Sequence, residues 1–305
     1  MLASPASGYY IKMLSIATLF LHQKPKQTQT MTESIAKHTA NHPAAWWGPR
    51  ELECDQALKF ELEGLQLAIA RQAHEWSFFY NQPGIQAEQP TSHWQQQLGV
   101  IDPDKYKEVA RFMFRETHAR LGILPALADR PVISKPITAL NLPSEEEMTI
   151  YVSSPLWLQI YSEESREPLL DIPIQRASDT WFGPSTQSGE LCYASRTHGR
   201  LSLENVPLRL HRAITPVVIR NRADTTLLLE RISLPAPNLS LYSDDNGQLW
   251  TEAITLERES DGDMASLEVD KKAPTHLKNP VRINEPRSPL QKGNLAIRAF
   301  SVLFE

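Results

Sequence analysis

Cysteine and glycine are both scarce in this sequence, which has two cysteines and twelve glycines in 305 residues. Because Cys54 and Cys192 are far apart in the chain, the dense disulfide framework of a small secreted domain is excluded. One disulfide between them fits the count, but we favour two free thiols in a reducing compartment, which predicts a cytoplasmic protein. The 23 prolines suit many short segments that end in fixed turns.

The common signatures of cofactor-dependent and nucleophilic enzymes are also missing. The sequence contains no GxxxxGK[ST] phosphate loop, no GxGxxG turn, no GxSxG elbow and no HExxH or CxxC pair. We therefore predict no cofactor and no metal site. An enzyme whose catalytic residues are scattered along the chain carries no such signature and stays open.

A strong basic charge and a long apolar run are lacking as well. The net charge is −5 and the isoelectric point is near 6.0, which argues against a nucleic-acid partner. The apolar run at residues 13–21 (MLSIATLFL) has nine residues and is too short to cross a bilayer. The sequence thus predicts a soluble protein that does not itself span a membrane.

The first 44 residues stand apart from the globular pattern, which begins near Trp46. Met13 and Met31 offer alternative starts, and no small-residue cleavage site follows the apolar run. We interpret residues 1–44 as a disordered tail or a start assigned too early, with a targeting segment as the alternative.

Strict alternation of apolar and polar residues is the clearest structural signal. Within residues 58–80, Leu58, Phe60 and Leu62 alternate with charged residues, and Gly64 interrupts the pattern before it resumes. A period of two predicts antiparallel strands with one wet face. Residues 102–122 are ambiguous between helix and strand, and we expect a short helical turn at Asp102-Pro103 that leads into a strand.

From residue 124 onward, short β-type segments alternate with turns. Asn221 to Asp224 predicts a hairpin between residues 214–220 and 226–232, and Asn246-Gly247 predicts another between residues 240–242 and 248–257. The expected fold is mainly β, with antiparallel β-sandwich units and few short helices. We expect an N-terminal β-rich region at 45–143 and a C-terminal β-sandwich at 144–305.

Arginine replaces lysine across a long part of the chain. Residues 136–270 contain ten arginines and no lysine, although twelve lysines occur elsewhere. Arginine suits bidentate contact with carboxylates or phosphates. The structural interpretation is pairing with carboxylates, for which the available acids are Asp171, Asp179, Glu190, Glu204 and Glu230. The functional alternative is an anion pocket or a partner surface.

Within residues 171–222, the DTWFG stretch places two large aromatic residues beside an acid. This arrangement fits a pocket mouth or an interface anchor, and closure of a sheet edge is the structural alternative. Cys192 would need His198 as a base to act as a nucleophile, so we interpret it as a buried apolar residue. The candidate binding residues are Asp179, Trp181, Phe182, Arg196, His198, Arg209, His211 and Arg212.

The sequence contains five distinctive phrases, which are LADRP (127–131), PLWL (155–158), SDTWFG (178–183), GELCYASR (189–196) and LWTEAITLE (249–257). Together they resemble a prokaryotic family catalogued as domain of unknown function 432. The similarity covers roughly residues 45–304. It implies an accessory role beside small-conductance mechanosensitive channels, and hence a membrane channel or another protein as partner.

Three functional hypotheses follow. The first is a non-enzymatic binding or regulatory protein, as an accessory to a mechanosensitive channel or in another setting. The second is an anion- or small-molecule-binding β-sandwich that uses the arginine-rich segment. The third is an enzyme with scattered site residues. The sequence does not indicate the oligomeric state.

Overall fold

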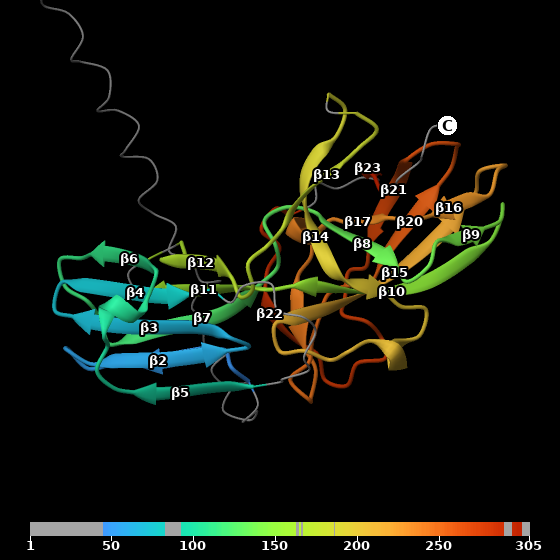
Figure 1. Cartoon of the computed structure of the whole chain (residues 1–305). Helices are drawn as coiled ribbons and strands as arrows, with labels where there is room; N and C mark the ends of the chain where they lie inside the picture. The colour runs from blue at the N-terminus through green and yellow to red at the C-terminus, as the bar shows by residue number, and fades with distance from the viewer. Residues whose placement is uncertain are drawn as a thin grey trace, which may run out of the picture.

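The computed structural model describes residues 45–82, 93–162, 165, 167–185, 187–289 and 295–300. The predicted N-terminal tail, residues 1–44, lies outside these described residues. Within them the chain forms strands joined by turns and three short 3-10 helices, so the prediction of a mainly β protein is confirmed. Figure 1 shows the N-terminal strands on the left and the C-terminal strands on the right.

The N-terminal strands form a five-stranded antiparallel sheet in the order β5-β2-β3-β4-β6. Their bounds are β2 Ala57–Leu62, β3 Leu65–Gln72, β4 Glu75–Asn81, β5 Trp94–Leu98 and β6 Glu108–Met113. The predicted alternation is confirmed, because Leu58, Phe60 and Leu62 are buried while the residues between them are half-exposed. Glu63 and Gly64 both have positive φ, as a two-residue type I′ hairpin turn requires.

The ambiguous segment at 102–122 resolves as predicted, with a helical turn followed by a strand. The 3-10 helix η1, Pro103–Lys105, precedes β6 with Asp102 before it and proline at its first position. Because β5 and β6 occupy opposite edges of the sheet, the chain between them crosses the sheet. Tyr106 lies 6.2 Å from Phe79 of β4, measured between ring centroids.

A second, four-stranded antiparallel sheet lies behind the first in Figure 1, with the order β1-β7-β11-β12. Its strands are β1 Gly48–Glu51, β7 Arg120–Ala126, β11 Trp157–Ser162 and β12 Leu170–Pro173. Their buried residues join those of the five-stranded sheet in one core. Its strands β1 and β7 precede the domain boundary predicted between residues 143 and 144, and its strands β11 and β12 follow that boundary. The division into two domains stays a prediction.

The C-terminal half is organised around β15 (Arg212–Asn221), the central strand of an eight-stranded sheet. β15 pairs with β10 along its whole length and in parallel with β19 and β20. The other strands of this sheet are β10 Glu147–Pro155, β18 Leu241–Ser243, β19 Leu249–Trp250, β20 Ile254–Arg258, β21 Met264–Val269, β22 Val281–Asn284 and β23 Leu295–Arg298.

One predicted hairpin is wrong and one is confirmed. β16 (Leu227–Leu229) pairs with β9 (Leu140–Leu142) and not with β15 as we predicted. The reason is that β10 and β20 already occupy both edges of β15. The hairpin around Asn246-Gly247 forms as predicted, between β18 and β19.

The remaining sheet has the order β13-β14-β8-β17 and joins β14 to β8 in parallel. Its strands are β8 Val132–Pro136, β13 Asp179–Phe182, β14 Glu190–Gly199 and β17 Ile232–Leu234. The other 3-10 helices are η2 Leu203–Asn205 and η3 Ala236–Asn238. Together with the β15 pairings, this makes the C-terminal half a mixture of antiparallel and parallel pairs.

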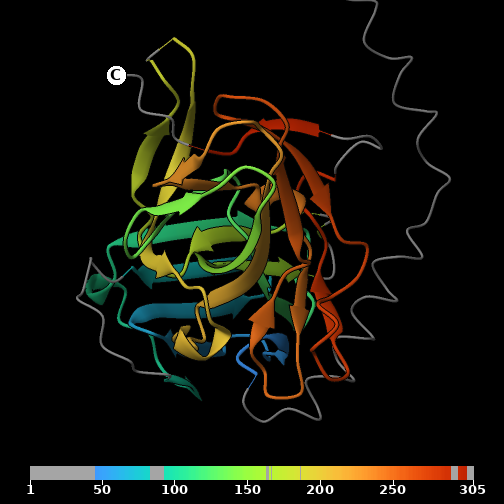
Figure 2. The same ribbon diagram turned by 90° about the vertical axis from the view of Figure 1, so that its right-hand side faces the viewer.

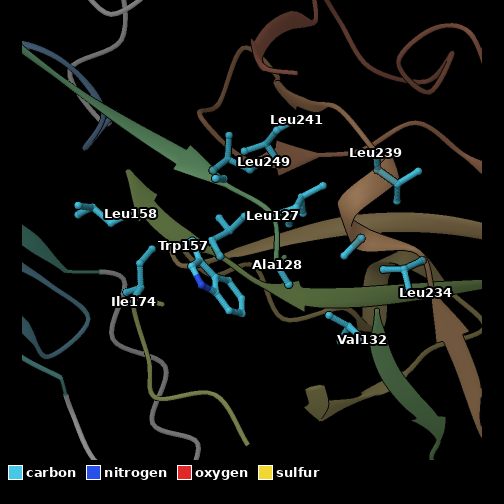
Figure 3. Packing of buried hydrophobic residues seen from close by; sticks show 14 of the residues in the cluster. Leu127, Ala128, Val132, Trp157, Leu158, Ile174, Leu234, Leu239, Leu241 and Leu249 are labelled. Atoms are coloured by element: carbon cyan, nitrogen blue, oxygen red, sulfur yellow. The ribbon is translucent and has the colours of Figure 1, made fainter. Parts of the chain in front are cut away.

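The hydrophobic core is continuous between the two halves. Figure 3 shows Trp157 and Leu127 near its centre, with Leu158 and Ile174 to one side and Leu234 and Leu239 to the other. These side chains come from both the β1-β7-β11-β12 sheet and the C-terminal sheets. Figure 2, turned by 90°, shows the β13–β14 hairpin rising from the top of the body.

Candidate functional site

The β13–β14 hairpin projects from the body (Figure 1). Its side chains alternate between a buried face and an exposed face. Phe182 and Cys192 face inward and pack with Ile133 of β8 in a small cluster. Trp181 and Leu191 are directly opposite each other across the two strands and face outward, with exposed fractions of 41% and 45%. The hairpin therefore presents two adjoining large apolar side chains to solvent on a packed base.

The indole of Trp181 is seated against the turn of the hairpin. Its Nε1 donates to the carbonyl of Ser185 at 2.9 Å. A Cβ at Gly189 would lie 2.6 Å from that Nε1, so only glycine allows the ring to lie so close to the backbone. The ring is thus held in place before any partner arrives.

Charged and aromatic groups continue this outward face toward the body. Arg130 forms an ion pair of 3.3 Å with Asp179, and its guanidinium lies 5.2 Å from the ring centroid of Tyr193. The Tyr193 hydroxyl donates to Asp129 at 3.0 Å. Burial and the hydrogen bond to Asp129 raise the pKa of Tyr193 to about 12, so this hydroxyl stays a donor.

We call this surface the hairpin patch and define it as Asp129, Arg130, Asp179, Trp181, Leu191 and Tyr193. Two arginines from other elements fix the hairpin to the body. Arg231 donates to the Trp181 carbonyl at 3.0 Å, and its guanidinium lies 5.2 Å from the Phe182 ring centroid. Arg298 of β23 donates to the Ser188 carbonyl at 3.0 Å.

Four of the five phrases that carried the family resemblance meet at this patch. LADRP supplies Asp129 and Arg130, SDTWFG supplies Asp179 and Trp181, and GELCYASR supplies Leu191 and Tyr193. PLWL supplies Trp157, whose ring centroid lies 5.2 Å from that of Tyr193. The candidate list drawn from the sequence missed the Asp129, Arg130, Leu191 and Tyr193 side chains, although their phrases were the available signal.

Of the predicted residues, Asp179, Trp181 and Phe182 lie together in this hairpin. Phe182 is 1% exposed and supports the patch from beneath. Arg196 lies farther along β14 and donates to the Ser178 hydroxyl at 2.9 Å. His198 is exposed near the end of β14, beside Lys135 of β8.

Arg209, His211 and Arg212 form a second group, where the two halves of the molecule meet. The Nδ1 of His211 lies 3.8 Å from Oε2 of Glu63, in the β2–β3 turn. Burial, Arg212 and Arg209 together lower the pKa of His211 to about 3. The Glu63 carboxylate opposes this shift, but desolvation and two guanidinium groups outweigh it, and His211 is neutral at pH 7.

The side chain of Arg212 is buried and hydrogen-bonded to two neighbouring strands. Its Nε donates to the Ser153 hydroxyl of β10 at 2.8 Å. Its Nη2 donates to the Ser153 carbonyl and, at 2.9 Å each, to the hydroxyls of Ser195 and Thr197 of β14. These bonds join the eight-stranded sheet to the sheet that carries the hairpin.

Three of the other arginines in the lysine-free region pair with acids. Arg220 contacts Glu147 and Glu257, Arg222 contacts Glu145, and Arg258 contacts Asp261. Of the acids named as candidates from the sequence, Asp171 and Asp179 pair with Arg287 and Arg130. Whether the candidate residues bind any ligand stays a prediction.

The described residues also line cavities away from the hairpin patch. One of about 490 Å³ lies between the five-stranded sheet and the crossing chain, lined in part by Ala57, Ala70, Phe79 and Val100. Another, of about 230 Å³, is lined in part by Gln159, Asn284 and Arg287. Neither is lined by a candidate residue from the sequence.

The two thiols are free in the structure, as we favoured. Burial, together with the charge of Glu190, raises the pKa of Cys192 to about 12, which suits the buried apolar role predicted for it. Six residues along one strand separate it from His198, or roughly 20 Å, so that histidine is out of reach as a base. Among the described residues, no cluster of three or more metal-ligating side chains occurs.

No helix in the described part of the chain is long and apolar enough to span a membrane. No curated protein and no solved structure matches the chain. A family model described as protein of unknown function (DUF432) matches residues 46–305, which is most of the sequence. The resemblance inferred from the five phrases is therefore confirmed, and the chain belongs to the DUF432 family.

Proposed function

We propose that this protein is a non-enzymatic binding protein that recognises a protein partner through the hairpin patch. The observation that carries the proposal is the exposure of Trp181 beside Leu191 on a projecting hairpin that is packed beneath and tied at its tip. Exposed large aromatic residues with fixed orientation are the usual anchors of protein interfaces, because they bury much area at little entropic cost.

The polar part of the patch supports a protein partner more than a small ligand. Asp129 and Asp179 flank Arg130, so apolar contact at the tip is bordered by hydrogen-bonding charges at the base. An apolar centre with a polar rim is the anatomy of protein interfaces. The matching partner surface has an apolar pocket for the indole and polar groups around it.

The accessory role implied by the family resemblance makes the part of a mechanosensitive channel outside the bilayer the first partner to test. Cytoplasmic location belongs to the same proposal and rests on the two free thiols.

The test is affinity capture of the tagged full chain from gently solubilised native cells, followed by mass spectrometry. We expect recovery of a specific partner that is lost with Trp181→Ser and with Leu191→Ser. Leu228→Ser is the matched control, because Leu228 on β16 is 43% exposed and lies outside the patch. Equal recovery by all variants would place the interface elsewhere and refute the proposal.

A further inference from the structure

The outer edge of β6 is a row of main-chain groups available for pairing. β6 is the last strand in the order β5-β2-β3-β4-β6, and no other described strand pairs with it. The Phe114 N–H donates to the His74 carbonyl at 2.9 Å, just beyond the end of the β4–β6 ladder. Because antiparallel bonds alternate, Phe112, Ala110 and Glu108 also bond inward, and the N–H and C=O groups of Val109, Arg111 and Met113 point outward.

The side chains on this edge are unusually apolar for an exposed strand. Val109 and Met113 are 56% and 69% exposed, on the outer face of the sheet. Phe112, on the inner face, is only partly buried although its ring lies 5.8 Å from that of Phe78. Edge strands are commonly protected by charges, proline or bulges. β6 has no proline and no bulge, and its two charged residues are Glu108 at its first position and Arg111, which is paired with Glu75.

We propose that two copies of this chain pair antiparallel through β6, joining their five-stranded sheets into one continuous ten-stranded sheet. The proposal concerns a surface separate from the hairpin patch and does not depend on the proposed function.

The outward groups determine the register of this pairing. Only residues 109, 111 and 113 can bond across the edge, so each must meet one of the same three residues in the second copy. The register with the most bonds places Arg111 opposite Arg111 and Val109 opposite Met113 at both ends. On the inner face it places Ala110 opposite Phe112, a small side chain against a large one. The strand is therefore complementary to itself about Arg111.

The apparent obstacle is the two arginines at the centre, because like charges directly opposite each other are unfavourable. Glu75 removes this repulsion, because the Nε and Nη2 groups of Arg111 donate to its carboxylate at 2.5 and 2.6 Å. Each copy thus brings a neutral Arg–Glu pair to the axis. The interface of a single six-residue strand is smaller than a standard one, so we expect a dissociation constant on the order of micromolar.

The test is sedimentation equilibrium of the full chain from about 1 μM to about 500 μM, together with a proline variant. Val109→Pro removes an outward N–H that makes no bond within one copy, so the monomer keeps its β4–β6 ladder. We expect the dissociation constant of the dimer to rise on the order of tenfold or more. The matched control is Leu98→Pro, at an outward position on the opposite edge strand β5, which should leave the dimer unchanged.

A second variant covers the case in which Val109→Pro lowers the melting temperature of the monomer. Met113→Lys should also dissociate the dimer, whereas Ile137→Lys, at a site that is 59% exposed away from β6, should not. Hydrogen exchange at the amides of Val109, Arg111 and Met113 should slow as the concentration rises. A chain that is monomeric throughout the range, or a dimer that survives both Val109→Pro and Met113→Lys, would overturn the proposal.

Discussion

The five-stranded N-terminal sheet and the eight-stranded C-terminal sheet differ in how far apart in the sequence their paired strands lie. In the first, β2, β3 and β4 follow one another through short turns and pair in sequence order. In the second, β15 takes its neighbours from β10 and β20, which are far away in the chain. Local turns therefore determine register in the N-terminal sheet, whereas one central strand determines it in the C-terminal sheet.

The two regions also differ in how they handle polar groups. In the five-stranded sheet the buried acid Glu75 is paired with Arg111, whose side chain is exposed. In the described part of the C-terminal half, Arg212 and Arg258 are buried, each with at least four hydrogen bonds to protein groups. A lysine ammonium has only three donors and no planar fork, so lysine could not make the bonds of either buried arginine.

The largest expected effect tests this contrast directly. Arg212→Ala should lower the free energy of unfolding by about 3–4 kcal/mol, because it leaves several buried hydroxyl and carbonyl groups without a donor. Arg196→Ala is the control, since its half-exposed side chain should contribute less than about 1 kcal/mol. Urea denaturation measures both, and equal losses would show that buried arginine does not distinguish the C-terminal half.

The contact between the two halves should respond to mild acid. His211 has its pKa lowered from 6.5 to about 3, so below pH 6.5 the unfolded chain takes up a proton that the folded chain does not. Stability is therefore full above pH 6.5 and should fall by about 2 kcal/mol by about pH 5. His211→Gln should remove this slope and the exposed His198→Gln should not, as urea denaturation at several pH values would show. If stability still fell with pH to the same extent in His211→Gln, His211 would not be the source of this pH dependence.

The N-terminal sheet should respond only to stronger acid. Hydrogen bonds from Arg111 and Ser77 lower the pKa of Glu75 from 4.5 to about 2. Their stabilising effect is present above pH 4.5 and is lost as the pH falls toward 2. Melting temperature plotted against pH should therefore be flatter in this range for Glu75→Gln than for the native chain. The control is Glu51→Gln, which removes the acid of the exposed Arg120–Glu51 pair. If Glu51→Gln flattened the curve as much as Glu75→Gln does, the effect could not be assigned to Glu75.

The smallest effect compares one turn from each region. Gly64 in the β2–β3 turn and Gly247 in the β18–β19 turn have φ of 86° and 76°. Replacement of either by alanine should cost about 1 kcal/mol, because alanine is strained in this conformation. If calorimetry shows one cooperative transition, both variants should shift it together. A separate transition shifted only by Gly64→Ala would mean that the N-terminal sheet unfolds independently.

The sequence predicted most of the β-structure because alternation is a local signal. It identified the strands around Phe60 and Phe78 and the turn at Asn246-Gly247, where residues close in sequence pair with each other. It failed at β16, because local turn residues carry no information about which edges of β15 distant strands occupy. The parallel pairings of β15 and β14 are non-local in the same way.

The candidate site was predicted in part. The DTWFG stretch indicated a special position, and alternation alone would have separated outward Trp181 from buried Phe182. The contribution of Asp129 and Arg130 could not be derived, because they reach the hairpin from a distant segment of the chain. Arg196 and His211 were grouped by their place in the sequence, whereas the structure places them on different elements.

The most direct test of the central claim is photo-crosslinking in living cells from a probe residue placed at position 191. Leu191 lies directly opposite Trp181, so an apolar probe at position 191 keeps an apolar side chain beside the indole. We expect a crosslink to a specific protein partner from position 191 and none from position 228, which has similar exposure. The same adduct from both positions, or none from position 191 while the partner is still captured, would contradict recognition through the hairpin patch.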